Sequence, residues 1–237
     1  MHQASLSSGR SNLRSKASLY VDFVIALGLA TLILAATSSS GDSSRFLPLL
    51  ALAMIGSTMK VRLPGMEGTY SPDFLFLLLG ILELDLGQTV LMAACCAIVQ
   101  CAWRPQRRPS ARQVAFNAAN LCASVALAYF CYHSAANWRP GERAVFLLPL
   151  AAVVYFAVNT LLVSGILCLL EGRPILKAWQ TWLWALPYCL LGSYVAIWMD
   201  SASRARDSKF LLVGLPLMYL AYLSYKAIVR QRRPRGV

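Results

Sequence analysis

Polar side chains inside long apolar runs are the residues of this sequence that could bind a ligand. Asn117 and Asn120 stand three positions apart, which places both amides on one face of a helix, and Asn159 stands at the centre of a later run. Gln100 and Asp22 lie near the ends of two other runs. Because an amide in hydrocarbon is costly unless it is hydrogen-bonded, each is expected to face another helix. The asparagines therefore either join helices to one another or line a pocket for a ligand or ion.

A second polar group occupies the turn-rich segment 60–73, which joins two unusually short apolar runs, 46–59 and 73–84. Short or interrupted segments of a membrane protein indicate a binding region, since irregular backbone is tolerated there only where protein or a wet cavity satisfies it. The alternative is an ordinary cytoplasmic loop. The candidate ligand-binding residues of this segment are Lys60, Arg62, Glu67, Tyr70 and Asp73.

Turn chemistry predicts where the second short run becomes helical. Pro64-Gly65 signals a turn. Ser71 followed by Pro72 predicts an N-cap and the first helical residue. Asp73 then lies close to the positive end of the helix dipole.

Catalytic and metal-binding patterns are missing from the sequence. The two histidines, His2 and His133, have no partner at catalytic or metal-ligand spacing, and neither a phosphate-binding loop nor a nucleophile elbow occurs. We therefore expect no enzyme, no metal site and no cofactor. The seven cysteines lack C-x-x-C spacing and are expected to pack as small apolar residues; they are Cys95, Cys96, Cys101, Cys122, Cys131, Cys168 and Cys189.

Tryptophans gather where a predicted helix starts. Trp179, Trp182 and Trp184 cluster there, with Trp198 near the opposite end of the same run. This distribution is typical of the aromatic belts of a membrane protein. A ligand cage built from these rings is the alternative.

The elements that must position these residues follow from composition. Hydrophobic residues make up 58% of the 237 residues and charged residues only 14%, against about 45–50% and about 25% in soluble domains. A helix needs roughly 20 apolar residues to cross a bilayer. Six runs approach or exceed that length: 19–37, 86–103, 113–133, 144–170, 178–199 and 210–229. We therefore predict an all-α, polytopic transmembrane helical bundle with six full-length spans plus two short membrane segments.

Orientation follows from the basic residues, because Lys and Arg are retained on the cytoplasmic side of short loops. If both short runs cross, sixteen of the 22 basic residues fall on one side and six on the other. Both termini are then expected to be cytoplasmic. The alternative, a re-entrant hairpin formed by the two short runs, keeps the same termini but places Lys60 and Arg62 near the middle of the membrane, where a cation is costly. Eight segments are therefore favoured over six plus a hairpin.

The chain is expected to form one domain with two tails. Residues 1–17 and 230–237 are basic cytoplasmic tails, and residues 18–229 form a single transmembrane helical domain. A net charge of +12 indicates contact with anionic lipid headgroups. Nucleic acid is not an expected partner, since no aromatic residues alternate with the basic clusters.

Four short motifs follow one another over residues 60–120. They are Leu63-Pro64-Gly65, Gly68-Thr69-Tyr70-Ser71, Trp103-Arg104-Pro105 and Phe116-Asn117. In this order they resemble the N-terminal membrane sensor region of bacterial cyclic-di-GMP signalling proteins that end in HD-GYP phosphodiesterase or GGDEF cyclase domains. The resemblance implies a multi-pass protein of the inner (plasma) membrane. The catalytic residues of those cyclase and phosphodiesterase domains have no counterpart in this sequence.

The loop that precedes a short helix also resembles, more faintly, the substrate-binding S components of energy-coupling-factor transporters. Two functions are therefore expected. The first is a sensory or small-ligand-binding membrane module without a catalytic domain, which passes a signal to a cytoplasmic partner protein. The alternative is a small-solute transporter or its S-component-like substrate-binding subunit.

Overall fold

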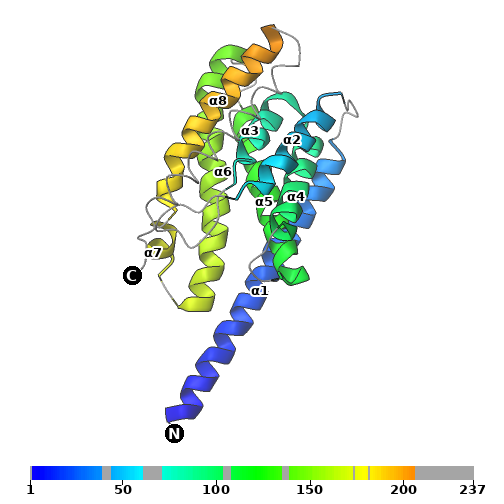
Figure 1. Ribbon diagram of the computed structural model, residues 1–237. Helices are drawn as coiled ribbons and strands as arrows, with labels where there is room; N and C mark the ends of the chain where they lie inside the picture. Colours follow the sequence, from blue (N-terminus) through cyan, green and yellow to red (C-terminus); the bar gives the residue numbers. More distant parts are fainter. Residues whose placement is uncertain are drawn as a thin grey trace, which may run out of the picture.

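The computed structural model describes residues 2–38, 44–60, 71–103, 108–134, 139–172, 174–180 and 182–205. This part of the chain is helical, without strands (Figure 1). The elements are α1 (His2–Ala36), α2 (Phe46–Thr58), α3 (Phe74–Glu83), α4 (Leu86–Ala102), α5 (Ala111–His133), α6 (Pro140–Glu171), α7 (Ile175–Gln180), the 3-10 helix η1 (Leu183–Ala185) and α8 (Leu186–Ala205).

Three of the described helices are long and apolar enough to cross a membrane. They are the Ser15–Ala36 part of α1, all of α5, and the Glu142–Glu171 part of α6. The described part of the chain is therefore all-helical and suited to a membrane, as the composition predicts. The helix of the N-terminal span starts at His2, so the polar segment expected as a tail continues the same helix.

Three of the six expected full-length spans do not appear as such in the described residues. The run 86–103 forms α4, whose 17 residues extend about 26 Å. The run 178–199 is divided among α7, η1 and α8, and Pro187 stands in the first turn of α8, where a proline is well tolerated. The run 210–229 lies outside the described residues.

The two short apolar runs form an antiparallel pair of helices, α2 and α3. At one end Arg45 Nη1 lies 3.0 Å from Glu83 Oε2, and at the other Ser57 Oγ donates to Asp73 Oδ2 over 3.2 Å. Their 13 and 10 residues extend about 20 and 15 Å, shorter than the roughly 30 Å of hydrocarbon in a bilayer. Gly56 allows this approach, since a β-carbon there would lie 3.3 Å from the Asp73 backbone.

The core of the bundle is built around α3. Every residue from Phe74 to Ile81 is buried, as expected for a helix that is apolar on all sides. It packs against α2, α4 and α8, and less extensively against α5 and α6. In contrast, large apolar side chains are exposed on α1 and α8, including Leu19, Phe23 and Trp198. Exposed apolar faces of this size mark a surface that contacts lipid or another apolar partner.

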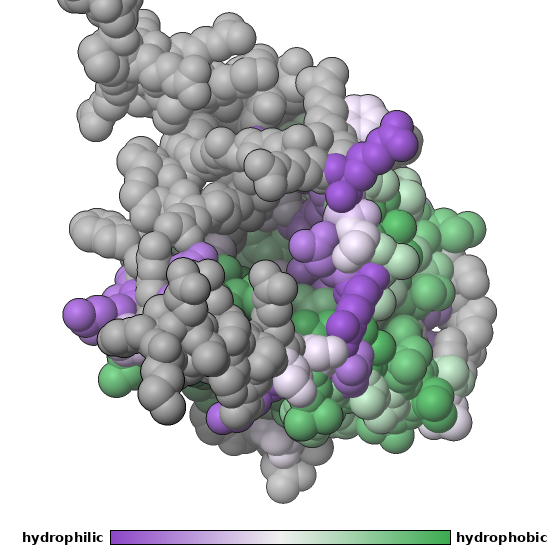
Figure 2. Space-filling view, turned by 90° about the horizontal axis from the view of Figure 1, so that it is seen from below, coloured by the Kyte–Doolittle hydropathy of each residue, from purple (hydrophilic) through white to green (hydrophobic). Residues whose placement is uncertain are grey.

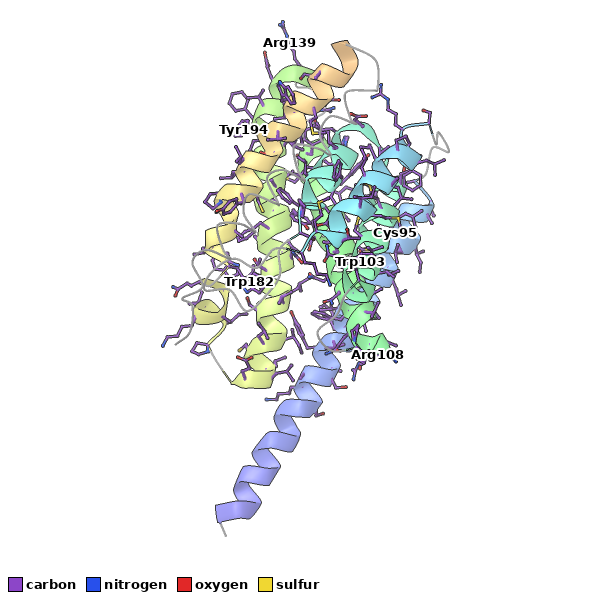
Figure 3. The ribbon with its side chains drawn as sticks, in the orientation of Figure 1. Cys95, Trp103, Arg108, Arg139, Trp182 and Tyr194 are labelled. Carbon is purple, nitrogen blue, oxygen red and sulfur yellow. The ribbon has the colours of Figure 1, made fainter. Side chains whose placement is uncertain are left out.

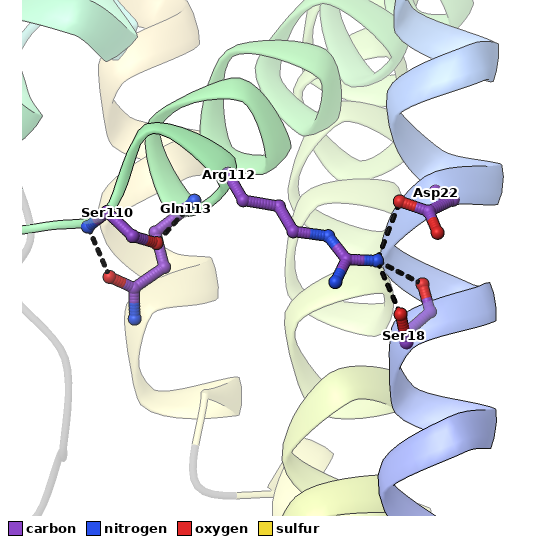
Figure 4. Close-up of polar contacts among 5 residues, drawn as sticks. All are labelled: Ser18, Asp22, Ser110, Arg112 and Gln113. Carbon is purple, nitrogen blue, oxygen red and sulfur yellow. Dashed lines mark hydrogen bonds and ion pairs between the residues drawn. The ribbon is translucent and has the colours of Figure 1, made fainter.

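Helix α1 is attached to α5 by a close crossing and by a polar contact. A β-carbon on Gly28 would overlap the side chain and backbone of Ala119, so the two helices approach closely there. Near the start of α5, Arg112 Nη2 donates to Asp22 Oδ1 over 2.6 Å and also to the hydroxyl and carbonyl oxygens of Ser18 (Figure 4). A capping box formed by Ser110 and Gln113 begins α5 beside this contact (Figure 4).

Candidate ligand cavity

A cavity of about 320 Å³ lies between α3, α4, α5, α6 and the η1–α8 segment. We call it the amide cavity. Its polar lining residues are Ser71, Asp73, Gln100, Asn117, Asn120, Asn159 and Thr160. Its remaining lining residues are Phe74, Ala97, Leu121, Tyr155, Phe156, Val163, Trp182, Ala185 and Cys189. Four residues proposed from the sequence, Asp73 and the three asparagines, are thus brought together from three segments of the chain.

Asp73 is the acidic residue of the amide cavity, and only 2% of it is exposed. Its carboxylate accepts hydrogen bonds from Ser71 Oγ at 2.5 Å, from Gln100 Nε2 at 2.5 Å and from Ser57 Oγ at 3.2 Å. The expected N-cap at Ser71 is therefore wrong: α3 begins at Phe74, and the Ser71 hydroxyl binds the Asp73 carboxylate instead of a backbone amide of the helix. All three donors are neutral groups, so they hydrogen-bond the Asp73 carboxylate without neutralising its negative charge.

Asn120 and Asn159 join α5 to α6 at the wall of the amide cavity. Asn120 Nδ2 donates to Asn159 Oδ1 over 2.5 Å and lies 3.4 Å from the Asn159 carbonyl oxygen. Only 3% of Asn120 is exposed, and its Oδ1 is buried without a hydrogen-bond partner in the described structure. A buried acceptor in this state costs about 1–3 kcal/mol, so a donor from a bound molecule would be stabilised there.

Two tryptophans near the amide cavity carry hydrogen-bond donors, in contrast to the acceptor oxygen of Asn120. Trp179 Nε1 donates to Thr160 Oγ1 over 2.9 Å, which fixes α7 against α6. The Nε1 of Trp182 lines the same region, is buried, and has no acceptor in the described structure. Trp198, by comparison, is 55% exposed on α8, as expected of a belt residue. The ligand-cage alternative thus fits Trp182, and the belt interpretation fits Trp198.

A larger groove of about 890 Å³ adjoins the amide cavity. It lies between α1, α5 and α6 and carries Arg108 and Arg112, so we call it the basic groove. Asn117 and Val163 line both spaces, which makes them the boundary between groove and cavity. Figure 3 shows Arg108 near the end of the bundle from which α1 projects, with Arg139 near the opposite end. Viewed from the α1 end, Figure 2 shows hydrophilic residues gathered around a hollow, with hydrophobic residues on the flank.

Segment 60–73 contributes less than the sequence indicated. Lys60 does not line the amide cavity; its Nζ donates to the Trp103 carbonyl oxygen over 2.7 Å at the end of α4. Partial burial lowers the pKa of Lys60 below its usual value, and the nearby Cys101 acts in the opposite direction. Arg62, Glu67 and Tyr70 lie outside the described residues. Asp73 is therefore the member of this group that the structure brings to the cavity.

Sequence reasoning missed several residues of the cavity. The sequence marks Gln100 only as a polar residue in an apolar run and Trp182 only as part of an alternative ligand cage, and it does not single out Thr160 or Tyr155. Each of these residues carries a polar atom in an otherwise apolar segment. Hydrogen bonding between helices explains that pattern as well as ligand binding does. Only the tertiary structure shows that these side chains face one space.

Metal-binding clusters are not found in the described part of the chain. All seven cysteines are free thiols, and no group of three or more His, Cys, Asp or Glu side chains could hold an ion among the described residues. His133 Nε2 lies 3.1 Å from the Ile81 carbonyl oxygen, which ties the end of α5 to α3.

Comparisons with protein-family models, with curated proteins and with solved structures found no match to this chain. The function must therefore be argued from the amide cavity itself.

Proposed function

We propose that this protein is a membrane-embedded receptor for a small polar molecule, which binds in the amide cavity. The observation that carries the proposal is the convergence of Asp73, Asn120 and Asn159 on one cavity of about 320 Å³. Polar groups are expensive in an apolar bundle unless each has a partner, and here Asn120 Oδ1 and Trp182 Nε1 have none in the described structure. The volume is at the small end of the range for ligand pockets.

The depth of the cavity supports this proposal. Asn120 lies nine residues beyond the start of α5, about 14 Å along a helix of about 35 Å. A ligand at that level would be sheltered from bulk water. The α2–α3 pair, each helix too short to cross, ends beside the cavity at Ser57 and Asp73. Half-length helices that meet near the middle of the membrane are typical of binding regions.

We further propose a sensory role, in which occupancy of the amide cavity is passed to a cytoplasmic partner protein. The lining of the amide cavity comes from α3, α4, α5, α6 and the η1–α8 segment, so a bound molecule would contact several helices at once. The proposed topology keeps both termini cytoplasmic.

A transporter subunit is the second candidate function. The basic groove favours it, because the groove lies next to the amide cavity and shares Asn117 and Val163 with it, as expected of a solute path that passes from one to the other. Proteoliposomes separate the two functions. Uptake of a bound solute supports transport, whereas binding without uptake, with or without an ATPase partner, supports sensing.

The binding proposal is tested by thermal unfolding of the full chain in lipid nanodiscs. Amino acids, vitamins, nucleobases and small amines are screened one at a time. A compound at 100 times its Kd should stabilise the protein by about 2.7 kcal/mol. Asn159→Leu, which removes an amide from the cavity, should abolish that shift, and Gln180→Leu on the exposed face of α7 should preserve it. Equal shifts in both variants, or no shift with any compound, would reject the cavity as a binding site.

A further inference from the structure

The chemical class of the ligand can be inferred from the charges and rings of the amide cavity. This inference rests on the proposed function, since it requires that the cavity binds a small molecule. We infer that the ligand is a compact organic molecule bearing a protonated amine or quaternary ammonium group, with Asp73 as its counter-ion.

The first observation is an acidic residue without a basic partner. Asp73 is 2% exposed and accepts hydrogen bonds only from neutral groups, on Ser71, Gln100 and Ser57. Among the described residues that line the cavity, none is Lys, Arg or His. A buried carboxylate is stable when it is paired and hydrogen-bonded. The hydrogen bonds are present, and a cationic ligand would supply the missing charge.

The second observation is independent of Asp73 and concerns Asn120. Its Oδ1 is an acceptor without a partner in the described structure, on a residue that is 3% exposed and lines the same cavity. Asp73 and Asn120 thus both place oxygen-bearing side chains at the wall of the cavity. An ammonium group is a donor without acceptors, so it matches a surface of this kind.

Aromatic rings complete the match to a cation. Tyr155, Phe156 and Trp182 line the cavity together with Asp73. A cation over an aromatic face is attracted by the ring quadrupole, most strongly over Trp, and the attraction increases when water is excluded. A carboxylate together with several rings is the environment in which quaternary ammonium groups bind. An anionic ligand would meet Asp73 without a compensating cation.

Binding of matched probes to the full chain in nanodiscs tests this inference. Choline is compared with its neutral isostere 3,3-dimethylbutan-1-ol, and benzylamine with benzyl alcohol, all at equal ionic strength set with sodium chloride. The amine of at least one pair should bind ten or more times more tightly than its neutral isostere. Asp73→Asn should reduce amine affinity about 10- to 100-fold, the range for a hydrogen bond to a charged group. Glu142→Gln, which removes an exposed carboxylate of α6, should leave the affinity unchanged.

If Asp73→Asn does not fold, a second pair of variants tests whether the ligand is a cation. Trp182→Phe keeps a ring, and Trp182→Leu removes it. The ratio of choline to isostere affinity should persist in the first and fall about fivefold or more in the second. A ratio that is the same in both variants would overturn the inference.

Outcomes with other compounds separate this inference from the proposed function. Stabilisation by uncharged or anionic molecules with no response to either amine, or neutral isosteres that bind as tightly as the amines, would overturn the amine assignment and leave the binding function standing. No response to any compound would reject both.

Discussion

The side-chain amide of Asn120 on α5 donates to Asn159 Oδ1 on α6 over 2.5 Å, although the two residues are 39 positions apart. Among the described helices, three are long enough to span a membrane, and this bond joins two of them. It also leaves the Asn120 Oδ1 without a partner in the described structure and places Asn120 on the wall of the amide cavity. One pair of residues thus joins two helices and forms part of the cavity wall.

A double-mutant cycle should measure this bond. Asn120→Ala and Asn159→Ala are each expected to destabilise the bundle, with a coupling energy of about 0.6 kcal/mol and at most roughly 1.7 kcal/mol, as for other interhelical hydrogen bonds in membranes. Unfolding is followed in mixed micelles by circular dichroism. Asn117→Ala is the control, because Asn117 is exposed and its amide donates to the Cys101 sulfur on α4, at 3.3 Å. Fully additive effects at Asn120 and Asn159 would contradict the geometry.

Gln100→Leu should destabilise the protein by about 1–3 kcal/mol, because it removes the amide that donates to Asp73 over 2.5 Å and leaves a buried carboxylate with one donor fewer. The loss should shrink strongly in an Asp73→Leu background, where no carboxylate remains to be satisfied. Unfolding by denaturant in mixed micelles measures both values. Gln180→Leu, at an exposed position, should change stability by less than about 0.5 kcal/mol. An undiminished loss in the Asp73→Leu background would show that Gln100 acts in another way.

Gly28→Leu should weaken the packing of α1 on α5 by about 1–3 kcal/mol, since even a β-carbon at this position overlaps Ala119. Ala30→Leu makes a matched control, because Ala30 is exposed on the same helix. Limited proteolysis and thermal unfolding in nanodiscs report the two variants. Similar stability of both would mean that α1 does not cross α5 at Gly28.

Val163→Trp should slow ligand binding, because Val163 lines both the basic groove and the amide cavity and a larger side chain would narrow the connection. The expected result is a lower association rate for any compound that stabilises the wild type. Leu161→Trp, on the exposed side of α6, should bind at the wild-type rate. Stopped-flow fluorescence measures the rates. Equal rates in the two variants would place the route to the cavity elsewhere.

Arg112→Gln should cost no more than about 1 kcal/mol, because Arg112 and Asp22 are both exposed and such pairs contribute little. The difference from wild type should decrease between 0.05 and about 1 M salt, as screening weakens the ion pair. Arg139→Gln at the opposite end of the bundle is the control (Figure 3). A loss that does not respond to salt would assign the effect to the Ser18 contacts instead.

Part of the candidate site could be predicted from the sequence. Asn117, Asn120 and Asn159 are predicted because a polar group in an apolar run needs a partner, and Asp73 because it belongs to the turn-rich segment between two short runs. All four line the amide cavity. Lys60 belongs to the same segment as Asp73 but binds the Trp103 carbonyl oxygen instead. The resemblance to sensor regions of cyclic-di-GMP signalling proteins stays a prediction.

What the sequence determined by itself was the class of protein: an apolar, helical chain suited to a bilayer. Hydropathy and run length are local properties, so they can be read along the chain without knowing any contact. The tertiary structure decided which polar residues meet. Asp73 reaches Ser57 across 16 positions and Gln100 across 27, and neither spacing belongs to a helical repeat. The cavity lies where the start of α3 meets α4, α5, α6 and the η1–α8 segment, and these elements are far apart along the chain.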